Sequence, residues 1–456
     1  MTDVPHTRGP VIGPEHPDFD TETAGYNRLI RHRPALVVGA TGAADVISAV
    51  RFAGERGMPL AVQATGHGPA VPADGAVLVN TRRMTGVRVD AGAHTARIEA
   101  GVRSGQLVHE AAAHGLAPLN GSAPEVGAVS YTLSGGIPLL GRRFGYAADH
   151  VRALDVVTAD GQLRQVSAES DGDLFWALRG GGGNFGVVVS MEVDLVPLAR
   201  LYGGGLFFPA DATADVLHTY RSWARSMPEQ MGSSVLLIRF PDAPALPEAL
   251  RAKYVSHVRI EYAGPADEGE RWVRPLRAVA SPLIDTVRDM PYREVGSIHQ
   301  DPTAPAPFYA RTMALRALER ETVDAILRTA GPEAGAPYLL ELRHLGGALS
   351  RPPAVPNAAG RRDAEFNLYS GSLVTSGELD RLRAAHDALH ATLVAWATGG
   401  VCLNFLTGPD ATQERVRSAY LPADYARLAQ LKRRWDPDNM FRINHNIAPA
   451  GASASM

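Results

Sequence analysis

The sequence predicts an α+β protein, with a first part of short strands and helices and a second part built on one large sheet. Strand-like and helix-like patterns alternate through the first 200 residues. In the middle third, widely spaced strand patterns are separated by long helical stretches, which is typical of a large sheet with helices on one face. With 456 residues, of which 45% are hydrophobic, the chain can form two or more domains around sizeable cores.

The first part begins as strand, helix, strand and glycine-rich loop. Apolar residues recur at helical spacing over Ala43–Arg56, between short apolar runs at Ala35–Val38 and Pro59–Val62. The second run leads directly into Gly66-His67-Gly68. A further helix is expected at Leu107–His114, and further strands at Ala76–Val79, Val87–Val89, Thr95–Ile98, Leu154–Thr158 and Gly186–Leu195.

The middle third repeats strand and helix patterns over longer stretches. Strands are expected at Leu206–Phe208, Val235–Phe240, Val258–Tyr262, Tyr338–Leu345 and Phe366–Leu373. The helical stretches are Ala212–Ser226, Ala317–Thr329 and Ser376–Trp396. After Gly400 the chain has a short apolar run, Val401–Leu406, and then a helix over Ala423–Trp435.

Composition and charge exclude several classes of protein. The 45 basic and 48 acidic residues nearly balance, which argues against a nucleic-acid binder. No stretch reaches the roughly 18 apolar residues of a membrane span, and the polar N-terminus lacks the apolar core of a signal peptide, so we expect a cytoplasmic protein. A single cysteine, Cys402, excludes an intrachain disulfide framework and a cysteine-cluster zinc site, and we expect no bound metal.

Glycine-rich loops are the strongest chemical signal in the first part. Without a Cβ, backbone N–H groups can approach an anion, so four such loops together would suit an extended diphosphate ligand. Any one loop alone is more often an ordinary turn, and the last lacks the G-x-G-x-x-G spacing of a Rossmann fold. His67 is either a cofactor anchor or an ordinary hydrogen-bonding histidine. The loops are Gly66–Gly68, Gly121–Gly127, Ser134–Gly136 and Gly180–Gly186.

Five segments occur together in the order and spacing of one known superfamily. By these segments the chain resembles the FAD-linked oxidoreductases of the vanillyl-alcohol oxidase / p-cresol methylhydroxylase (PCMH) type, in the berberine bridge enzyme-like branch. The resemblance extends from about Tyr26 to Ile447. The segments are PLAVQATGHG at 59–68, GSAPEVGAVSYTLSGG at 121–136, DHVRALDVVTADG at 149–161, DLFWALRGGGGNFGVV at 173–188, and 401–447, which ends in WDPDNMFRINHNI.

The resemblance implies three regions. Residues 1–200 would form a PCMH-type FAD-binding domain of two α+β subdomains, and residues 201–400 a substrate-binding domain whose large antiparallel sheet is covered by helices. Residues 401–456 would return to the FAD-binding domain as the berberine bridge-like C-terminal segment. The oligomeric state stays open.

The same resemblance implies how FAD is held. In the family, a histidine in the loop that here is Ala64-Thr65-Gly66-His67-Gly68 is linked to the flavin 8α carbon, which assigns an 8α-histidyl link to His67. Many relatives add a cysteinyl link, but Ala123 occupies the cysteine position here, so we expect none. The other positions that match cofactor contacts are Ser122, Val126, Gly127, Gly135, Gly136, Gly141, Val151, Gly183, Asn184, Phe185, Gly186, Val187, Asn404 and Asn446.

Some positions depart from the family pattern. Ser130, Ser134 and Pro138 stand where relatives commonly carry glycine, so a positive φ at any of them would strain the backbone. Phe405 replaces a tyrosine that often takes part in catalysis. The catalytic base of relatives projects from a strand that here is 365–373, which makes Tyr369 the candidate base. A register shift of one residue would instead select Leu368 or Ser370.

The resemblance also implies the reaction. The protein would take a hydride from a small organic substrate, such as an alcohol, an amine, a sugar or a secondary metabolite, to flavin N5 and reduce O2 to H2O2. A dehydrogenase that uses another electron acceptor is one alternative. A non-redox, pericyclase-like protein that keeps FAD only as a scaffold is another, since the tyrosine and several glycines of relatives are replaced.

Overall fold

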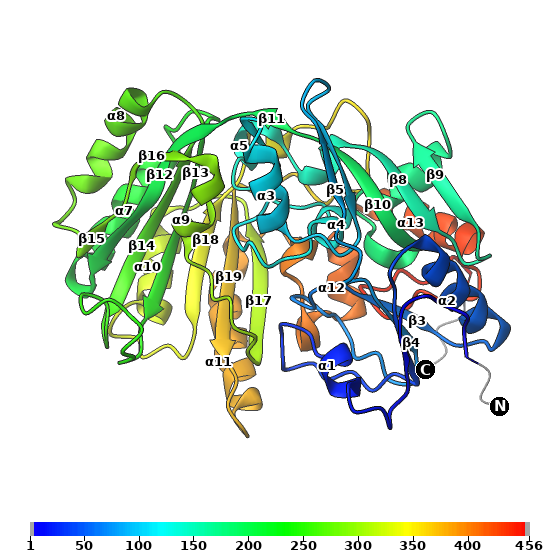
Figure 1. Cartoon of the computed structure of the whole chain (residues 1–456). Helices are drawn as coiled ribbons and strands as arrows, with labels where there is room; N and C mark the ends of the chain where they lie inside the picture. Colours follow the sequence, from blue (N-terminus) through cyan, green and yellow to red (C-terminus); the bar gives the residue numbers. More distant parts are fainter. Residues whose placement is uncertain (1–3, 452–456) are drawn as a thin grey trace.

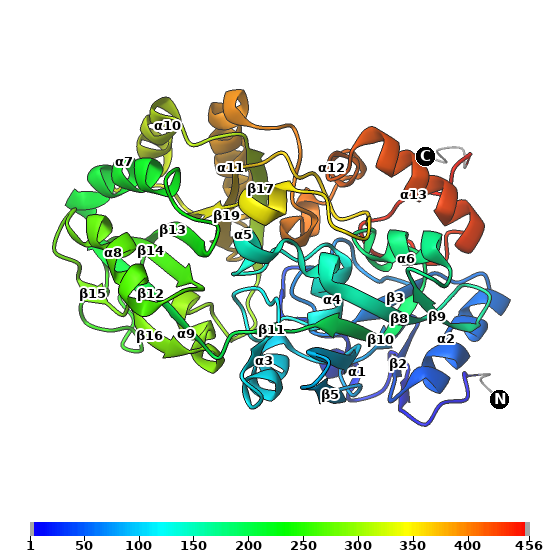
Figure 2. The same cartoon turned by 90° about the horizontal axis from the view of Figure 1, so that it is seen from above.

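The computed structural model describes residues 4–451 and confirms the predicted α+β class. Two groups of sheets lie side by side in Figure 1. Small sheets from the first 200 residues form one part, and a sheet of eight strands forms the other. The C-terminal helices lie against the first part, as Figures 1 and 2 both show.

The first part contains two main sheets. The four-stranded sheet has the order β1-β2-β4-β3, with β1 antiparallel and the other three strands parallel. The five-stranded sheet has the order β5-β6-β10-β8-β9 and is antiparallel. Their bounds are β1 Val11–Ile12, β2 Leu36–Gly39, β3 Leu60–Gln63, β4 Val77–Asn80, β5 Val87–Asp90, β6 Thr95–Glu99, β8 Val151–Val157, β9 Leu163–Ser167 and β10 Val187–Asp194.

The helices of the first part cover these sheets and connect them. Helix α2 buries Val46, Ala49 and Val50 in the cluster that also contains Val38, Val79 and other apolar side chains of both main sheets. The spacing of three and four residues places these side chains on one helix face. The helices are α1 Phe19–Thr23, α2 Ala43–Glu55, α3 Ser104–Ala112, α4 Ala128–Leu133, α5 Gly141–Phe144 and α6 Gly172–Leu178, and β7 Leu116–Ala117 pairs with β11 Val196–Pro197.

The second part is one antiparallel sheet with helices on its outer face. The strand order is β15-β12-β14-β13-β18-β19-β17, and β16 also pairs with β12. Helices α7, α8, α10 and α11 lie along the outer face in Figure 2. Their bounds are α7 Thr213–Ala224, α8 Ala266–Arg277, α10 Arg320–Ala330 and α11 Leu379–Leu393, with strands β12 Arg200–Pro209, β13 Met231–Arg239, β14 Tyr254–Tyr262, β15 Ile284–Asp285, β16 Arg288–Pro291, β17 Phe308–Leu315, β18 Leu339–His344 and β19 Phe366–Leu373.

The two faces of this sheet differ in polarity. On β14, Val258 and Ile260 pack in the apolar cluster under the outer helices. The alternate residues His257, Arg259 and Glu261 are also buried, but they lie on the opposite, inner face. That face is turned towards the first part, where α5 contacts β13 and the short helix α9, Gly296–His299, contacts β14.

The C-terminal segment returns to the first part, where it is held by a buried polar cluster. Helix α12 spans Gln413–Ser418 and α13 spans Pro422–Trp435. Lys432 on α13 is fully buried, and its Nζ donates to Asp436 at 2.7 Å and to the backbone carbonyls of Asn184 and Phe441. The side-chain oxygen of Asn184 accepts from the backbone N–H of Ile447 at 2.9 Å. These bonds attach the chain end to the loop before β10.

Replacing Lys432 with methionine is therefore expected to destabilise the protein strongly. The change leaves Asp436 buried without its partner, which typically costs about 3–5 kcal/mol. Burial already lowers the pKa of Lys432 to about 8, although Asp436 opposes the shift. Urea unfolding should show the loss, and Lys253→Met is the matched control because Lys253, the other lysine, is exposed. Equal midpoints for both variants would contradict the role of Lys432.

Several expectations can be compared with these elements. The apolar run Val401–Leu406 contains a short 3-10 turn, at Leu403–Phe405. Strain at Ser130, Ser134 or Pro138 is not realised, since none of them has a positive φ. Within residues 4–451, no helix is both long and apolar enough to cross a bilayer. The cytoplasmic location and the three-region division stay predictions.

Candidate functional site

His67 lies in a loop directly after β3, clamped between two neighbouring segments. Its ring stacks on that of Tyr26, with centroids 3.9 Å apart, and its Nδ1 lies 2.9 Å from Thr65 Oγ1. Gly66 has a φ of +67°, and a Cβ at this position would come within 2.4 Å of Gly25 Cα. Glycine is therefore required for the loop to approach the 25–27 segment so closely.

The second ring nitrogen of His67 has no partner. Nε2 is buried and makes no hydrogen bond with any described residue. Burial, with help from Arg103, lowers the pKa of His67 to about 4, so the imidazole is neutral at physiological pH. When Nδ1–H donates to Thr65, Nε2 keeps a free lone pair. The loop thus presents one buried nucleophilic nitrogen.

The surroundings of His67 fit the diphosphate and ring system of FAD. No hydrogen bond joins the backbone N–H groups of Gly66, His67 and Gly68 to any residue in the described range 4–451. Free N–H groups in a glycine loop are suited to an anion. The buried side-chain oxygens of Asn444 and Asn446 are also without partners. These unsatisfied groups are what a bound nucleotide would be expected to cover.

The structure brings most of the predicted cofactor loops into one contiguous region. Thr65 Oγ1 also accepts from the backbone N–H of Gly127 at 3.3 Å, which joins the loop of His67 to the loop at 121–127. Helix α4 then leads to Gly135 and Gly136, and a Cβ at Gly182 would lie 3.9 Å from Ser134 Oγ. A Cβ at Gly183 would lie 3.8 Å from the side-chain amide nitrogen of Asn444, so the C-terminal segment also borders this loop.

Some predicted contacts have other roles in the fold. The side-chain oxygen of Asn404 accepts from Gly136 N–H at 2.8 Å and its amide donates to the Tyr131 carbonyl, so it fixes the 131–136 loop. The side chain of Asn184 holds the C-terminal tail, as described above. The side chains of Phe185, Val187 and Val151 are buried in apolar clusters, and Gly141 begins α5, close to Leu349. Ser122 and Val126 are half-buried in the 121–127 loop, and Gly186 has a φ of +153° before β10.

Tyr369 lies on the inner face of the large sheet. It is the cross-strand partner of Glu341, and its ring centroid is 5.7 Å from that of Phe405, in the C-terminal segment. Leu368 is buried under the outer helices, and Ser370 bonds His386 of α11 at 2.7 Å. Burial and the nearby carboxylate of Glu341 raise the pKa of Tyr369, so its hydroxyl is a proton donor at neutral pH.

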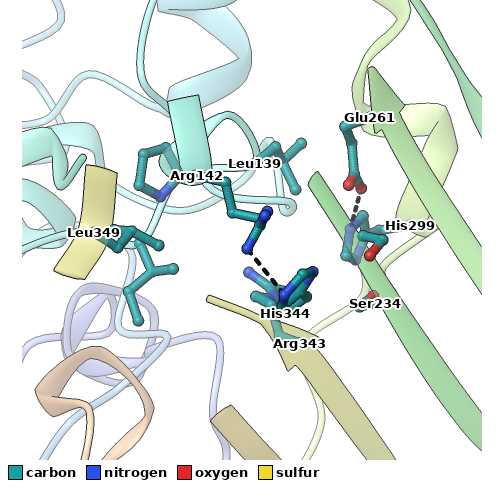
Figure 3. Close-up of a pocket in the computed structure, with 11 residues that line it drawn as sticks. Leu139, Arg142, Ser234, Glu261, His299, Arg343, His344 and Leu349 are labelled. Atoms are coloured by element: carbon teal, nitrogen blue, oxygen red, sulfur yellow. Dashed lines mark hydrogen bonds and ion pairs between the residues drawn. The ribbon is translucent and has the colours of Figure 1, made fainter. Parts of the chain in front are cut away.

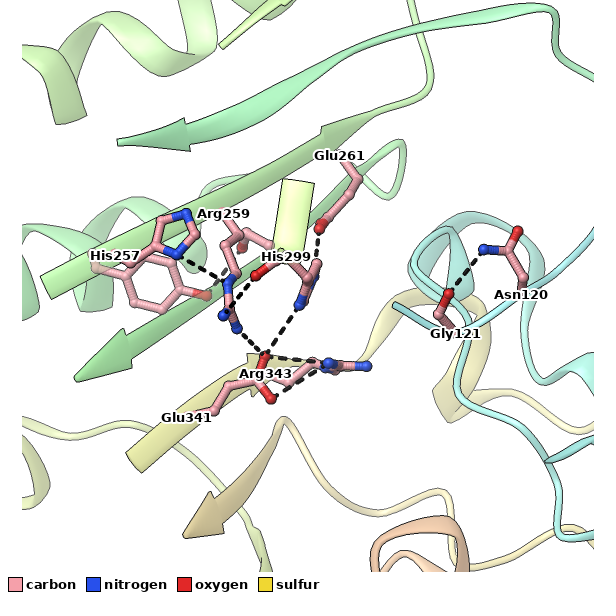
Figure 4. A network of polar contacts seen from close by, with 10 residues as sticks. Asn120, Gly121, His257, Arg259, Glu261, His299, Glu341 and Arg343 are labelled. Atoms are coloured by element: carbon pink, nitrogen blue, oxygen red, sulfur yellow. Dashed lines mark hydrogen bonds and ion pairs between the residues drawn. The ribbon is translucent and has the colours of Figure 1, made fainter. Parts of the chain in front are cut away.

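Beside Tyr369, the inner face carries a buried network of charged side chains. Figure 3 shows that β13, β14, β18 and the loop leading to α5 enclose a small cavity. Figure 4 shows the ion pairs behind it, in which Glu341 contacts both Arg259 and Arg343 and His299 contacts Glu261. The cavity is lined by Ile137, Pro138, Leu139, Arg142, Ser233, Ser234, Glu261, His299, Arg343, His344 and Leu349.

The two carboxyl groups of the network differ in protonation. Burial raises the pKa of Glu261 to about 8, although Arg343 and Arg259 oppose the shift. Burial would also raise the pKa of Glu341, but the adjacent Arg343 and Arg259 guanidinium groups hold it below its usual value. Burial and the same arginines lower the pKa of His299 well below its usual range. At neutral pH, Glu341 is therefore ionised while Glu261 and His299 are neutral.

Glu261→Gln is expected to remove a pH dependence of stability. Because the folded-state pKa of about 8 lies above the unfolded value, Glu261 stabilises fully at low pH and loses this contribution as the pH rises to about 8. Glutamine imitates the protonated acid at every pH. The variant should match the wild type near pH 4.5 and become progressively more stable than it towards pH 8. Urea unfolding at several pH values measures this difference; parallel curves would contradict it.

Sequence reasoning missed most of this network. Arg259, Glu261, His299, Glu341 and Arg343 were not among the candidate residues. A signal was present in β14, where the alternate residues His257, Arg259 and Glu261 interrupt an otherwise apolar strand. The same pattern is equally typical of a strand whose polar face is exposed to solvent. Only the packing of the first part against this face shows that these side chains are buried.

Known protein families and solved structures resemble this chain in sequence and in fold. A family model for FAD binding domains matches residues 34–167, and a model described as berberine and berberine like matches residues 404–448. The chain is 31% identical to (R)-6-hydroxynicotine oxidase of Paenarthrobacter nicotinovorans over 98% of both proteins. The solved 6-hydroxy-D-nicotine oxidase of Arthrobacter nicotinovorans superposes with a TM-score of 0.86 at 26% identity, covering 98% of this chain and 99% of that one. Chitooligosaccharide oxidase, at 21% identity, has a TM-score of 0.83 over 97% of both chains and shares the fold.

Proposed function

Because the chain belongs to the FAD-linked oxidoreductases with a berberine-like C-terminal region, we propose that it oxidises a small organic substrate and passes the electrons to O2. That it is an FAD-dependent oxidoreductase follows from the family. The choice of O2 as electron acceptor, with H2O2 as product, is supported by the full-length similarity to an oxidase. This similarity is the observation that carries the proposal.

We propose that the glycine loops of the first part and the C-terminal segment hold FAD, which supplies the acceptor for two electrons. His67 would be linked to it through Nε2, because this nitrogen is buried, neutral and unpartnered. The residues proposed to line the cofactor are Ala64, Thr65, Gly66, His67, Gly68, Ser122, Val126, Gly127, Gly135, Gly136, Gly141, Val151, Gly183, Asn184, Phe185, Gly186, Val187, Asn404 and Asn446.

Tyr369 is the proposed catalytic residue of the substrate side. Its hydroxyl makes no hydrogen bond with any residue in the described range, and it lies on the inner face beside Phe405. A free phenol in this place can bind the alcohol or amine group of a substrate and exchange a proton with it. The ionised carboxylate of Glu341, opposite Tyr369 on the next strand, helps to raise the pKa of the phenol, so the hydroxyl keeps its proton until a substrate group accepts it.

A reoxidation experiment tests the proposal. The purified protein should be yellow, and after anaerobic bleaching with dithionite its colour should return within seconds of mixing with air. A peroxidase-coupled assay should detect H2O2 during turnover of amines, secondary alcohols or sugars. A bleached protein that recovers colour only with an added electron carrier would instead be a dehydrogenase. Turnover of a substrate without any bleaching would identify a non-redox FAD protein.

A further inference from the structure

Three buried guanidinium groups lie at the inner face: Arg142 and Arg343 line the cavity, and Arg259 lies behind it. Arg142 Nε donates to the Met231 carbonyl at 2.9 Å, and its other nitrogens contact Met227, His344 and Leu345. Arg259 bonds Glu341 at 3.0 Å, the His299 carbonyl at 3.2 Å and His257 at 3.3 Å. Every guanidinium nitrogen of these two arginines therefore has a structural partner.

Arg343 is different, because much of its guanidinium group is unbonded. Its hydrogen bonds within residues 4–451 all come from Nη2, which contacts the two oxygens of Glu341 at 3.2 and 3.4 Å. Nε is buried and has no hydrogen-bond partner, and only 9% of the side chain is exposed. Figure 4 shows the free end of Arg343 pointing away from Glu341, towards the part that carries Asn120 and Gly121. Arg343 thus has donors to offer inside the cavity.

The charges around the cavity do not balance. Arg142 and Arg343 line it with two positive charges, and Glu261, the one carboxyl group in the lining, is protonated. Glu341, which pairs with Arg259 and Arg343, is ionised but lies behind the lining. Asp301, the next carboxylate to act on Arg343, does not line the cavity. Unpaired charge in a buried place is costly, and an anion that enters the cavity would remove that cost.

The other donors of the cavity are arranged around Arg343. Ser234 is its cross-strand partner on β13, so the hydroxyl and the guanidinium group lie on the same face. Protonated Glu261 can donate to His299 Nε2 across 2.9 Å, which leaves a proton on Nδ1; this nitrogen makes no hydrogen bond and lies 3.7 Å from Glu341 Oε1. The cavity itself measures about 10 Å³, which is room for about one water-sized atom group such as a carboxylate oxygen and not for a whole substrate.

We propose that Arg343, Ser234 and His299 form a subsite for a carboxylate of the substrate, so that the natural substrate is an organic acid. The proposal rests on the proposed function and names its substrate class. Arginine and hydroxyl donors suit a carboxylate, and the apolar side chains of Leu139, Leu349 and Phe405 suit an adjoining hydrocarbon or ring. A metal ion is not the expected occupant, since no group of metal-ligating side chains was found in the described chain.

Paired probes of equal shape test the subsite in the holoenzyme. Benzoate and phenylacetate are titrated against benzamide and phenylacetamide, with calorimetry and the flavin difference spectrum as readouts. Each acid should bind about tenfold or more tightly than its amide, because only the acid neutralises Arg343. Equal affinities for acid and amide would overturn the proposal.

Two variants with opposite expected effects distinguish carboxylate binding by Arg343 from a purely structural role of this residue. Arg343→Met should abolish the preference for the acids, whereas Glu341→Gln should increase their affinity about tenfold, because it frees the Nη2 donor of Arg343. Arg351→Met is the control, since Arg351 is an exposed partner of Glu229 in the same part of the chain. Thermal unfolding checks that each variant is folded. An unchanged preference in folded Arg343→Met would overturn the proposal.

The outcomes for the subsite and for the oxidase proposal are distinct. A yellow protein that oxidises a neutral amine or alcohol and ignores the acids would keep the oxidase and overturn the subsite. A colourless protein would overturn the flavin function, while calorimetry with the same probes would still decide the subsite.

Discussion

Replacing His67 with alanine is expected to move all yellow colour from the acid-precipitated protein into the supernatant. The reason is that His67 Nε2 is a buried, neutral and unpartnered nitrogen in the loop proposed to hold FAD. Alanine removes the only side chain proposed to form the link. The wild-type pellet should stay yellow, and mass spectrometry should find the flavin on the peptide that contains residue 67.

The matched control for this change is His114→Ala, since His114 is exposed and follows α3 at some distance in the chain from the glycine loop. Its pellet should stay yellow. Thr65→Val provides a finer test: it removes the hydroxyl that contacts Nδ1 but leaves Nε2 in place, so attachment should become slower without changing position. Flavin found on a residue other than His67 would refute the assignment.

Tyr369→Phe is expected to lower the rate of turnover by about 100-fold or more, the usual contribution of a positioned proton donor or acceptor. Phenylalanine keeps the ring that contacts Phe405 and removes only the hydroxyl. Binding of the substrate should change less than the rate of the chemical step, because the ring still fills its place. Flavin bleaching in single-turnover mixing measures that step directly.

Tyr309→Phe is the control for this experiment. Tyr309 lies on β17, the strand next to the one that carries Tyr369. Its ring, however, packs against His386 of α11 on the outer face. Loss of its hydroxyl should leave the rate of bleaching unchanged. If Tyr369→Phe and Tyr309→Phe bleached equally fast, Tyr369 would not be the catalytic residue.

The strands and helices that could be predicted are those in which apolar residues recur at the spacing of a helix or a strand. Helix α2 and strand β14 fall where the pattern placed them, because α2 buries one continuous face and β14 is buried along its whole length. Strand β17 and helix α8 were missed. The strand alternates poorly because it carries Arg311 and Thr312, and the helix contains Pro275 and is mostly polar. Their positions depend on contacts with distant segments, which a local pattern does not contain.

The sequence by itself determined the family, the glycine loops around His67 and the existence of a large covered sheet, because these depend on local motifs in a fixed order. Only the tertiary structure decided which side chains share the inner face. Burial depends on what packs against a strand, so Arg343, Glu261 and His299 became a site only when three separate segments met there. The free nitrogen of His67 likewise became visible only through its contact with Thr65.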